Sequence, residues 1–528
     1  MSSSREIPEE VLQAVYKHVR QIAKERAIEL SEDTNIVELG LDSLERMEII
    51  ASLEETFGGR FPEQVLPSIE TCREVAAAIL DYLPVGNVTL TPITPPEKQI
   101  ASDCYDIAQF PEVRTLEQTL SMAKAAGFES PYFTVHEGIA LDRTKIAGRE
   151  MVSWSTYNYV GMSGDPAVMA GAKAAIDRYG TSVSASRLVS GEKVIHGELE
   201  RKIADFFGME DAIVFVGGHA TNETVIGHVV GPGDLVLHDS LAHNSLMQGA
   251  ILSGARRRAF SHNDAEAADK LLRQIRGEYR RVLVVIEGVY SMDGDFANLP
   301  QFIQVAKHHK ALLMVDDCHG TAVMGSHGRG IAEHYGCDPH DIDLLMGTLS
   351  KGLGSCGGYI AGSHALVKWL KYTTPGFVYA CGMPPASAGA ALAAIRVLER
   401  EPNRVTVLRA NAELFLDLAK AAGLNTGMSG GTAIIPIILG NSVACLKVSK
   451  ALFTRGINVQ PILYPAVEES AARLRFFISS VHTPSQIRET VMALSEEIAA
   501  IGFDRSGTIS SPESQRASVH STVNTARK

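Results

Sequence analysis

The chain has 528 residues, of which 45% are hydrophobic, and its formal net charge is −12 at pH 7. This length predicts two or three domains, and the negative charge argues against a nucleic-acid partner. The seven cysteines form no CxxC pair, and no apolar signal region follows Met1, so we expect a reducing, cytoplasmic setting. No run of about 18 apolar residues occurs, so we expect no integral membrane segment.

The first 83 residues are predicted to form a separate, acidic helical bundle. Residues 1–85 contain 8 Lys and Arg residues against 17 Asp and Glu residues. Apolar residues recur at helical spacing in the ranges 11–23, 44–51 and 75–80. The motif Gly-Leu-Asp-Ser-Leu, residues 40–44, places Ser43 at the start of the second helix, where Asp42 and Ser43 alone would simply form a cap. The exposed face of this helix is predicted to carry Glu45, Glu48, Glu54 and Glu55.

Two segments have the composition of linkers or tails. Residues 84–108 begin with a stretch rich in proline and threonine, which predicts a linker. Residues 504–528 are rich in Ser, Thr and Arg with few apolar residues, which predicts a disordered tail.

From about residue 110, short apolar segments alternate with helical segments. Runs rich in β-branched residues, with helices between them, indicate an α/β fold with a mainly parallel sheet that is covered on both faces. We place a large domain at 109–385, including an N-terminal arm, and a smaller C-terminal α+β domain at 386–503. The predicted strands are 212–216, 235–237, 282–286, 312–315, 344–346 and 358–361.

Lys351 and Asp316 together suggest the chemistry. Lys351 lies in a loop rich in Gly and Ser, and Asp316 ends a predicted strand. A Schiff-base lysine and an aspartate that keeps a pyridine nitrogen protonated are the two groups that a pyridoxal phosphate (PLP) enzyme needs.

Polar residues follow the other predicted strands as well. The segment 217–222 could hold a phosphate at a helix N-terminus, although a glycine pair after a strand is more often a tight turn. His243, the segment 287–295 and His319 could each be ordinary loop or capping residues. Their joint order before Lys351 favours a common site, because ligands bind at the carboxyl ends of strands in such sheets.

Over residues 110–503 these motifs resemble the α-oxoamine synthase family, which are fold-type-I PLP acyltransferases and homodimers. The resemblance rests on these loops and on four further segments, which are 158–161, 186–191 with His196, 383–385, and 464–467 before Arg473 and Arg475.

The resemblance implies a role for each matching residue. It implies that Lys351 holds the PLP aldehyde and that Asp316 bonds the pyridine nitrogen. His243 would stack on the ring, and His319 and Ser291 would contact its O3′. The implied phosphate contacts are Gly218, His219 and Thr348, and the implied contacts to the substrate carboxylate are Arg475 and, less directly, Asn158.

Spacing leaves one choice open, and three positions depart from the family pattern. Arg473 and Arg475 would share one face of a strand, so spacing cannot choose between them. Leu463 stands where some members carry a second arginine, and residues 380–381 read Ala-Cys where a partner-subunit loop often supplies hydroxyls. His219 occupies a position that is often aromatic or apolar.

The N-terminal bundle resembles an acyl carrier protein domain. That resemblance implies that Ser43 receives 4′-phosphopantetheine from a phosphopantetheinyl transferase, and that the acidic helix docks on partner enzymes such as other carrier-dependent synthases.

Together the resemblances imply a decarboxylative condensation of a small amino acid with a carrier-bound acyl thioester. The amino acid would be serine, glycine or alanine, and the product would be an α-aminoketone. A PLP-dependent aminotransferase acting on a carrier-bound carbonyl compound is the alternative, and a non-catalytic carrier scaffold is a second one.

Overall fold

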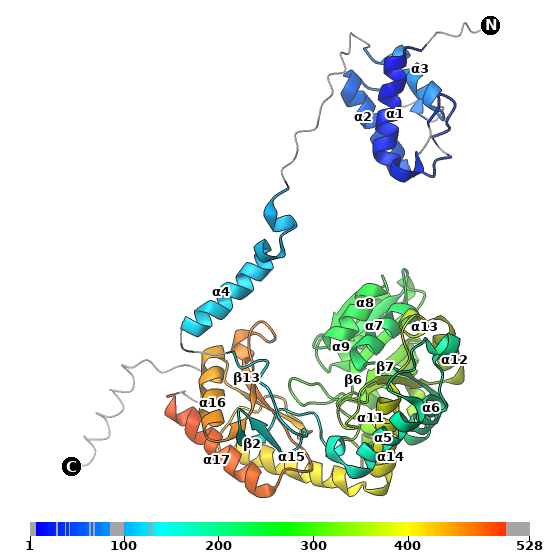
Figure 1. Cartoon of the computed structure of the whole chain (residues 1–528). Coiled ribbons are helices and arrows are strands. Elements are labelled where there is room, and N and C mark those ends of the chain that lie inside the picture. The colour runs from blue at the N-terminus through cyan, green and yellow to red at the C-terminus, as the bar shows by residue number, and fades with distance from the viewer. Residues whose placement is uncertain are drawn as a thin grey trace. The chain divides into compact units, whose positions relative to one another are not determined.

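The computed structural model describes residues 7–27, 30–36, 38–41, 43–62, 65–66, 69–84, 100–125, 127 and 130–502. The chain divides into two compact units, Met1–Gln118 and Thr119–Lys528, and each is described by itself (Figure 1). The predicted tail 504–528 and most of the predicted linker, residues 85–99, lie outside the described residues. Within the described ranges, no helix is long and apolar enough to span a membrane.

The first unit contains the predicted helical bundle. Its helices are α1 (Glu9–Ala23), α2 (Ser43–Phe57) and α3 (Cys72–Tyr82), and a 3-10 turn, η1 (Lys24–Arg26), follows α1. Val15, Val19, Leu53 and Ile79 are fully buried in a shared core. These apolar residues recur on one face of each helix, which is why the helices pack together.

Ser43 is the first residue of α2, as the sequence predicts. Two of the four predicted surface glutamates bond within the domain. Glu45 pairs with Arg26 at 2.5 Å, and Glu54 Oε1 accepts the Phe61 backbone N–H at 2.7 Å. Glu48 and Glu55 are exposed, so they are the carboxylates of this face that stay open to a partner.

After the bundle, the described part of residues 100–125 is helical. It holds the 3-10 turns η3 (Ser102–Cys104) and η4 (Ile107–Gln109) and the helix α4 (Pro111–Ala125). The predicted linker therefore ends in helical turns, and its boundaries stay predictions.

The centre of the second unit is a seven-stranded sheet in the order β3-β9-β8-β7-β6-β4-β5. Strands β4 to β8 are parallel to one another, and β9 runs antiparallel to β3 and β8. The mainly parallel sheet is thus confirmed. The strands are β3 (Asp211–Phe215), β4 (Leu235–Asp239), β5 (Arg256–Phe260), β6 (Val282–Glu287), β7 (Leu312–Asp316), β8 (Leu344–Thr348) and β9 (Gly358–Gly362).

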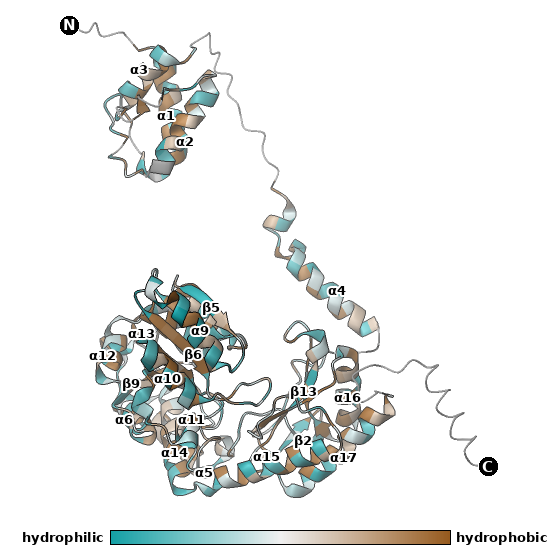
Figure 2. Ribbon diagram, turned by 180° about the vertical axis from the view of Figure 1, so that it is seen from behind, coloured by the Kyte–Doolittle hydropathy of each residue, from teal (hydrophilic) through white to brown (hydrophobic). Residues whose placement is uncertain are grey.

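Both faces of this sheet are buried, as the apolar runs predict. Val284 packs into one core cluster, while its neighbours Leu283 and Val285 pack into another. Successive strand side chains point to opposite faces, so each cluster lies on its own face, and β6 is almost uniformly hydrophobic (Figure 2).

Different helices cover the two faces of the sheet. The first face is covered by α7 (Gly218–Val229), α8 (Asn244–Leu252), α12 (His364–Thr373) and α13 (Pro375–Val378). The other face is covered by α6 (Val194–Phe207), α9 (Ala265–Ile275), α10 (Leu299–His309), α11 (Gly330–Tyr335) and α14 (Pro385–Arg400), and α5 (Pro166–Tyr179) packs on α14.

Two small sheets complete this unit. The strands β10 (Ile434–Ile438), β13 (Arg473–Phe477) and β12 (Gln460–Ile462) form one antiparallel sheet. The hairpin of β1 (Arg143–Ile146) and β2 (Arg149–Ser153) pairs in parallel with β11 (Ile457–Asn458), with Val152 opposite Ile457. The hairpin, which the sequence groups with the large domain, is therefore joined to the C-terminal segment. The remaining helices are α15 (Asn403–Ala421), α16 (Ser442–Thr454) and α17 (Pro484–Ala500).

Candidate active site

The predicted polar residues converge where the central strands end. Glu287 ends β6, Asp316 ends β7 and Thr348 ends β8. Glu287 and Asp316 are direct register partners. Because these strands are parallel, their carboxyl ends form one edge, and the loops after them meet there.

Asp316 is buried and held by two donors. Asn222 Nδ2 donates to its Oδ2 at 2.7 Å, and the Cys318 backbone N–H donates to its Oδ1 at 3.1 Å. The same Asn222 nitrogen also donates to Ser245 Oγ at 2.9 Å. These bonds fix the carboxylate so that it can meet a cationic nitrogen in one geometry.

His243 caps the N-terminus of α8. Its Nδ1 lies 2.7 Å from Ser245 Oγ, and its backbone N–H donates to Glu287 Oε1 at 2.6 Å. Partial desolvation of the ring, helped by the charge of Lys351, lowers the pKa of His243 despite the attraction of Asp316. A neutral ring with one fixed edge suits stacking rather than proton transfer.

Glu287 is the functional residue to which the sequence assigned no role. Burial, followed by the charge of Asp316, raises the pKa of the Glu287 carboxyl well above its usual range. The carboxyl fixes the backbone of His243 by accepting its N–H. Its place at a strand end beside Asp316 was the signal that could have found it.

His319 is buried beside Tyr159, with its Nδ1 2.8 Å from the Tyr159 hydroxyl. Burial, helped by the charges of Lys351 and Arg475, lowers the pKa of His319 well below its usual range. His319 is therefore neutral and oriented by one hydrogen bond. These properties suit a group that contacts O3′ of a PLP ring. Ser291 enters the site through its backbone carbonyl, which accepts from Arg475 Nη1 at 2.9 Å.

The structure separates the two candidate arginines on β13. Arg473 is buried and donates to Asp293 at 2.6 Å and to the Met292 carbonyl at 3.0 Å. Arg475 packs its guanidinium over the Phe477 ring at 4.7 Å, and its buried Nε has no hydrogen-bond partner. Burial lowers the pKa of Arg475 from its usual value. Arg475 thus keeps donor capacity for an incoming carboxylate, whereas Arg473 is committed to the protein.

A phosphate could bind at the N-terminus of α7. Gly217 is the N-cap of α7 and Gly218 its first residue. A Cβ built on Gly218 would lie 2.9 Å from Thr348 Oγ1, so only glycine leaves this space open. His219 lies beside this position, with its Nε2 3.2 Å from Glu223 and its ring 6.2 Å from the His243 ring.

Lys351 opens onto a cavity of about 350 Å³. Its Nζ lies 5.9 Å from the centroid of the Tyr157 ring, which lines the same cavity. Asn158 is also in the wall, but its amide is used there: Nδ2 donates to the Ala140 carbonyl at 2.8 Å, and Oδ1 accepts the Ser163 N–H at 3.1 Å. Asn158 therefore shapes the cavity wall.

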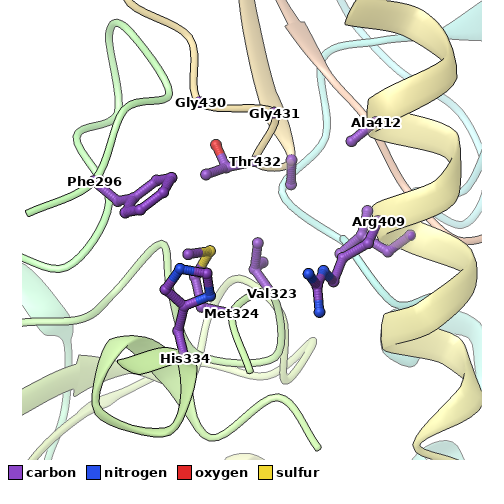
Figure 3. Close-up of a pocket in the computed structure, with 11 residues that line it drawn as sticks. Phe296, Val323, Met324, His334, Arg409, Ala412, Gly430, Gly431 and Thr432 are labelled. Carbon is purple, nitrogen blue, oxygen red and sulfur yellow. The ribbon is translucent and has the colours of Figure 1, made fainter. Parts of the chain in front are cut away.

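A second, smaller cavity of about 70 Å³ lies between α15 and the loops that follow β6 and β7 (Figure 3). Phe296, Met324 and His334 face Arg409 and Thr432 across it. None of the predicted site residues lines this cavity.

The residues at the strand edge fit PLP. Asp316 is placed to meet a pyridine nitrogen, and the exposed His243 ring is placed to cover the face of the cofactor ring. Gly218 and Thr348 are placed to hold a phosphate, and these groups lie within reach of Lys351. Two positions that depart from the family pattern lie elsewhere: Leu463 packs against the main core, and Cys381 is exposed.

Comparison with known proteins supports this assignment. A family model described as "Aminotransferase class I and II" matches residues 149–494, and one described as "Phosphopantetheine attachment site" matches residues 13–79. A putative 8-amino-7-oxononanoate synthase from Desulforudis audaxviator is 40% identical, over 72% of this chain and 98% of the relative. The 8-amino-7-oxononanoate synthase of Thermoanaerobacter pseudethanolicus is 35% identical, over 72% of this chain and 95% of the relative.

Solved structures share the fold. A serine palmitoyltransferase from Sphingomonas wittichii superimposes with a TM-score of 0.71 at 31% identity, over 74% of this chain and 98% of that chain. A serine palmitoyltransferase variant from S. paucimobilis, solved with a bound PLP–myriocin aldimine, also gives a TM-score of 0.71, at 30% identity over 74% of this chain and 98% of that chain. Fold and site thus define a PLP-dependent transferase of fold type I. Within that class, the chain belongs to the α-oxoamine synthases, which are PLP-dependent acyltransferases, and it carries a phosphopantetheine-binding domain.

Proposed function

We propose that this enzyme condenses serine, glycine or alanine with an acyl thioester carried on the phosphopantetheine arm of Ser43, with loss of carbon dioxide. The observation that carries the proposal is the half-buried Arg475 on β13, whose buried Nε is unpaired and whose charge, with that of Lys351, acts on His319. A planar guanidinium is the matching partner for the carboxylate of a small amino acid.

PLP would be held by residues at this edge. Asp316 would bond the pyridine nitrogen, and His243 would cover the ring face. Gly218, His219 and Thr348 would hold the phosphate, and His319 with Ser291 would lie at O3′. When bound, PLP supplies an electron sink for the α-carbon of the amino acid.

The protein's own groups then orient the reaction and move its protons. Arg475 would hold the amino acid carboxylate, and Asn158 would shape the wall of the cavity beside Lys351. Lys351 would take the α-proton and later return one, so it serves as both base and acid. A carbon–carbon bond forms between the α-carbon and the acyl carbonyl carbon while the thiol leaves. The carboxyl group then departs as carbon dioxide, giving an α-aminoketone with no net oxidation or reduction.

The donor would be attached to Ser43. A phosphopantetheinyl transferase would load this serine, and other carrier-dependent synthases would supply the acyl group through the face with Glu48 and Glu55. We further propose that the enzyme acts as a cytoplasmic homodimer.

The test uses the full-length protein with phosphopantetheine on Ser43 and PLP bound. Carboxyl-¹³C serine, glycine and alanine are offered with an acylated arm, and ¹³CO₂ is trapped. Label released only when both substrates are present supports the condensation, and Lys351→Ala and Ser43→Ala should each abolish it. Transfer of the amino group to the cofactor without ¹³CO₂ would instead establish an aminotransferase.

A further inference from the structure

His262 joins the carboxyl end of β4 to the loop that follows β6. Its side chain is 13% exposed, and its Nδ1 lies 2.8 Å from Asp239 Oδ1 while its Nε2 lies 2.9 Å from Asp295 Oδ2. Although burial opposes the charge, the hydrogen bonds to Asp239 and Asp295 raise the pKa of His262 to about 10. Both ring nitrogens therefore carry a proton at pH 7, and each donates to a carboxylate.

The topology of the central sheet brings these three groups together. Asp239 is the last residue of β4 and is fully buried, and its register partner Phe260 is the last residue of β5. His262 comes just after Phe260, and Asp295 lies in the loop between β6 and α10. Because β6, β4 and β5 are adjacent parallel strands, their carboxyl ends form one edge. The charged ring thus lies between carboxylates from two other strand ends.

Asp239 holds the loop after β6 in two ways, once directly and once through His262. The Tyr290 hydroxyl donates to Asp239 Oδ2 at 2.9 Å, and the Tyr290 backbone N–H donates to the Asp295 carbonyl at 2.9 Å. Among the described residues, Asp295 Oδ1 is buried without a hydrogen-bond partner, and the contact from Asn263 Nδ2 to Oδ2 is 3.5 Å long. The Asp295 carboxylate therefore depends on His262 for its close donor.

The tip of the same loop lies on β13. The Ser291 carbonyl accepts from Arg475 Nη1 at 2.9 Å, and the Met292 carbonyl accepts from Arg473 Nη1 at 3.0 Å. The Gly294 N–H donates to the Tyr290 carbonyl at 2.8 Å, which closes the turn that carries this tip. A shift at the base of the turn, where Asp295 lies, therefore moves the carbonyl that orients Arg475.

We propose that His262 is a positioning residue for the amino acid substrate. Its bridge between Asp239 and Asp295 holds the loop so that the Ser291 carbonyl directs Arg475 toward the substrate carboxylate. This inference rests on the proposed role of Arg475 and adds a residue that acts through it.

The test is Asp295→Ala in the full-length, PLP-loaded enzyme. This variant breaks the bridge but leaves His262 paired with Asp239, so no carboxylate stays buried without its cation. The dissociation constant of serine, glycine or alanine is read from the change in PLP absorbance, and kinetics give kcat and both KM values. We expect the dissociation constant and the KM for the amino acid to rise about tenfold, with kcat and the KM for the acyl donor unchanged. A wild-type dissociation constant overturns the inference, and so does an equal rise in the KM for the acyl donor.

Two further variants separate positioning from general stability. Asp269→Ala is the matched control, because His309 Nε2 lies 2.8 Å from Asp269 Oδ1 in a similar pair between α9 and α10. It should leave amino acid binding as in the wild type. His262→Gln combined with Asp295→Ala should weaken binding less than the product of the two single effects, because both act through one bridge. Effects that simply multiply would show that His262 acts by another route.

Arg475→Lys distinguishes this inference from the role on which it rests. If Arg475→Lys weakens amino acid binding and Asp295→Ala does not, the positioning role of His262 alone is wrong. If Arg475→Lys also leaves the dissociation constant unchanged, the proposed role of Arg475 is wrong and the inference falls with it.

Discussion

Three glycines surround the buried carboxyl of Asp317, the residue that follows Asp316. A Cβ at Gly288, Gly320 or Gly330 would lie within 1.9 Å of one of its carboxyl oxygens. Asp317 Oδ2 accepts the Ile331 N–H at 2.9 Å, while Oδ1 is buried without a partner. Burial raises the pKa of Asp317 to about 7. The glycines therefore make room for a carboxyl group that is protonated, and so uncharged, below about pH 7.

This raised pKa makes stability depend on pH. An unfolded aspartate ionises near pH 4, so between pH 4 and 7 the native state binds one more proton than the unfolded state. The contribution of Asp317 to the free energy of unfolding is complete below pH 4. It is lost as pH rises to about 7, at roughly 1.4 kcal/mol per pH unit.

We expect Asp317→Asn to remove this loss of stability with rising pH. Denaturation would be followed by tryptophan fluorescence, because both tryptophans lie in the second unit. Between pH 5 and 7 the wild type should lose stability relative to the variant, and the exposed Asp177→Asn should behave as wild type. Parallel curves for all three proteins would show that Asp317 is ionised throughout.

The two arginines of β13 should respond differently to substitution. Arg475→Lys loses the planar fork that binds a carboxylate, so kcat/KM for the amino acid should fall about 100-fold, or about 2.7 kcal/mol, with an unchanged melting temperature. Arg473→Leu leaves Asp293 buried without its cation and should cost about 3–5 kcal/mol of stability. The reverse pattern would make Arg473 the substrate ligand.

The sequence predicted which residues meet at the site better than it predicted what holds them. Asp316 ends β7 and His243 follows β4, two parallel strands with only β6 between them, so their convergence is a consequence of topology. The contacts of Asn222 and Glu287 join strands and helices far apart in sequence, and residue spacing carries no information about them. The spacing of Arg473 and Arg475 on one strand could not show which of them binds a substrate. Only the structure shows that Asp293 pairs with Arg473.

At the level of elements, the loop between β6 and α10 connects the central sheet to the small sheet formed by β10, β13 and β12. Gly294 has a φ of +71°, and a Cβ there would lie 1.9 Å from the Ile434 carbonyl of β10. The Gly294 carbonyl accepts from Thr432 Oγ1 at 2.9 Å. The same loop supplies the carbonyl of Ser291 to Arg475.

We therefore expect Gly294→Ala to shift this loop away from β10. Stability should fall by about 1–3 kcal/mol, because the backbone conformation is strained for alanine and the close contact must open. KM for the amino acid should also rise, since Ser291 and Arg475 move. Gly277→Ala, where a Cβ meets nothing within 4 Å, is the control for both thermal unfolding and kinetics.

Hydrophobic runs in the sequence correctly predicted strands of the central sheet, but one strand without such a run was missed. Six strands of the central sheet were predicted, but β5 begins with Arg256, Arg257 and Arg258 and shows no apolar run. As an edge strand with exposed side chains it needs no buried pattern, and charged residues protect such an edge. The antiparallel direction of β9 and its pairing with β3 also depend on contacts that sequence periodicity does not encode.

For the whole molecule, composition alone indicated a separate acidic unit, since charge and the proline-rich stretch differ from the rest. We expect the carrier of one chain to serve the site of another. A mixture of Ser43→Ala and Lys351→Ala chains should then release ¹³CO₂, although each variant alone is inactive. If the mixture stays inactive while a wild-type sample at the same concentration works, each carrier serves only its own chain.

The bond between Arg475 and the Ser291 carbonyl would make the proposed amino acid substrate a competitor of the protein's own backbone. A carboxylate that captures this guanidinium frees the carbonyl, and with it a loop that ties β6 to β10 and β13. Binding of the amino acid would therefore lower the protection of this backbone against hydrogen exchange. Hydrogen exchange of residues 288–296 should quicken when the amino acid binds, and Arg475→Lys should abolish the response.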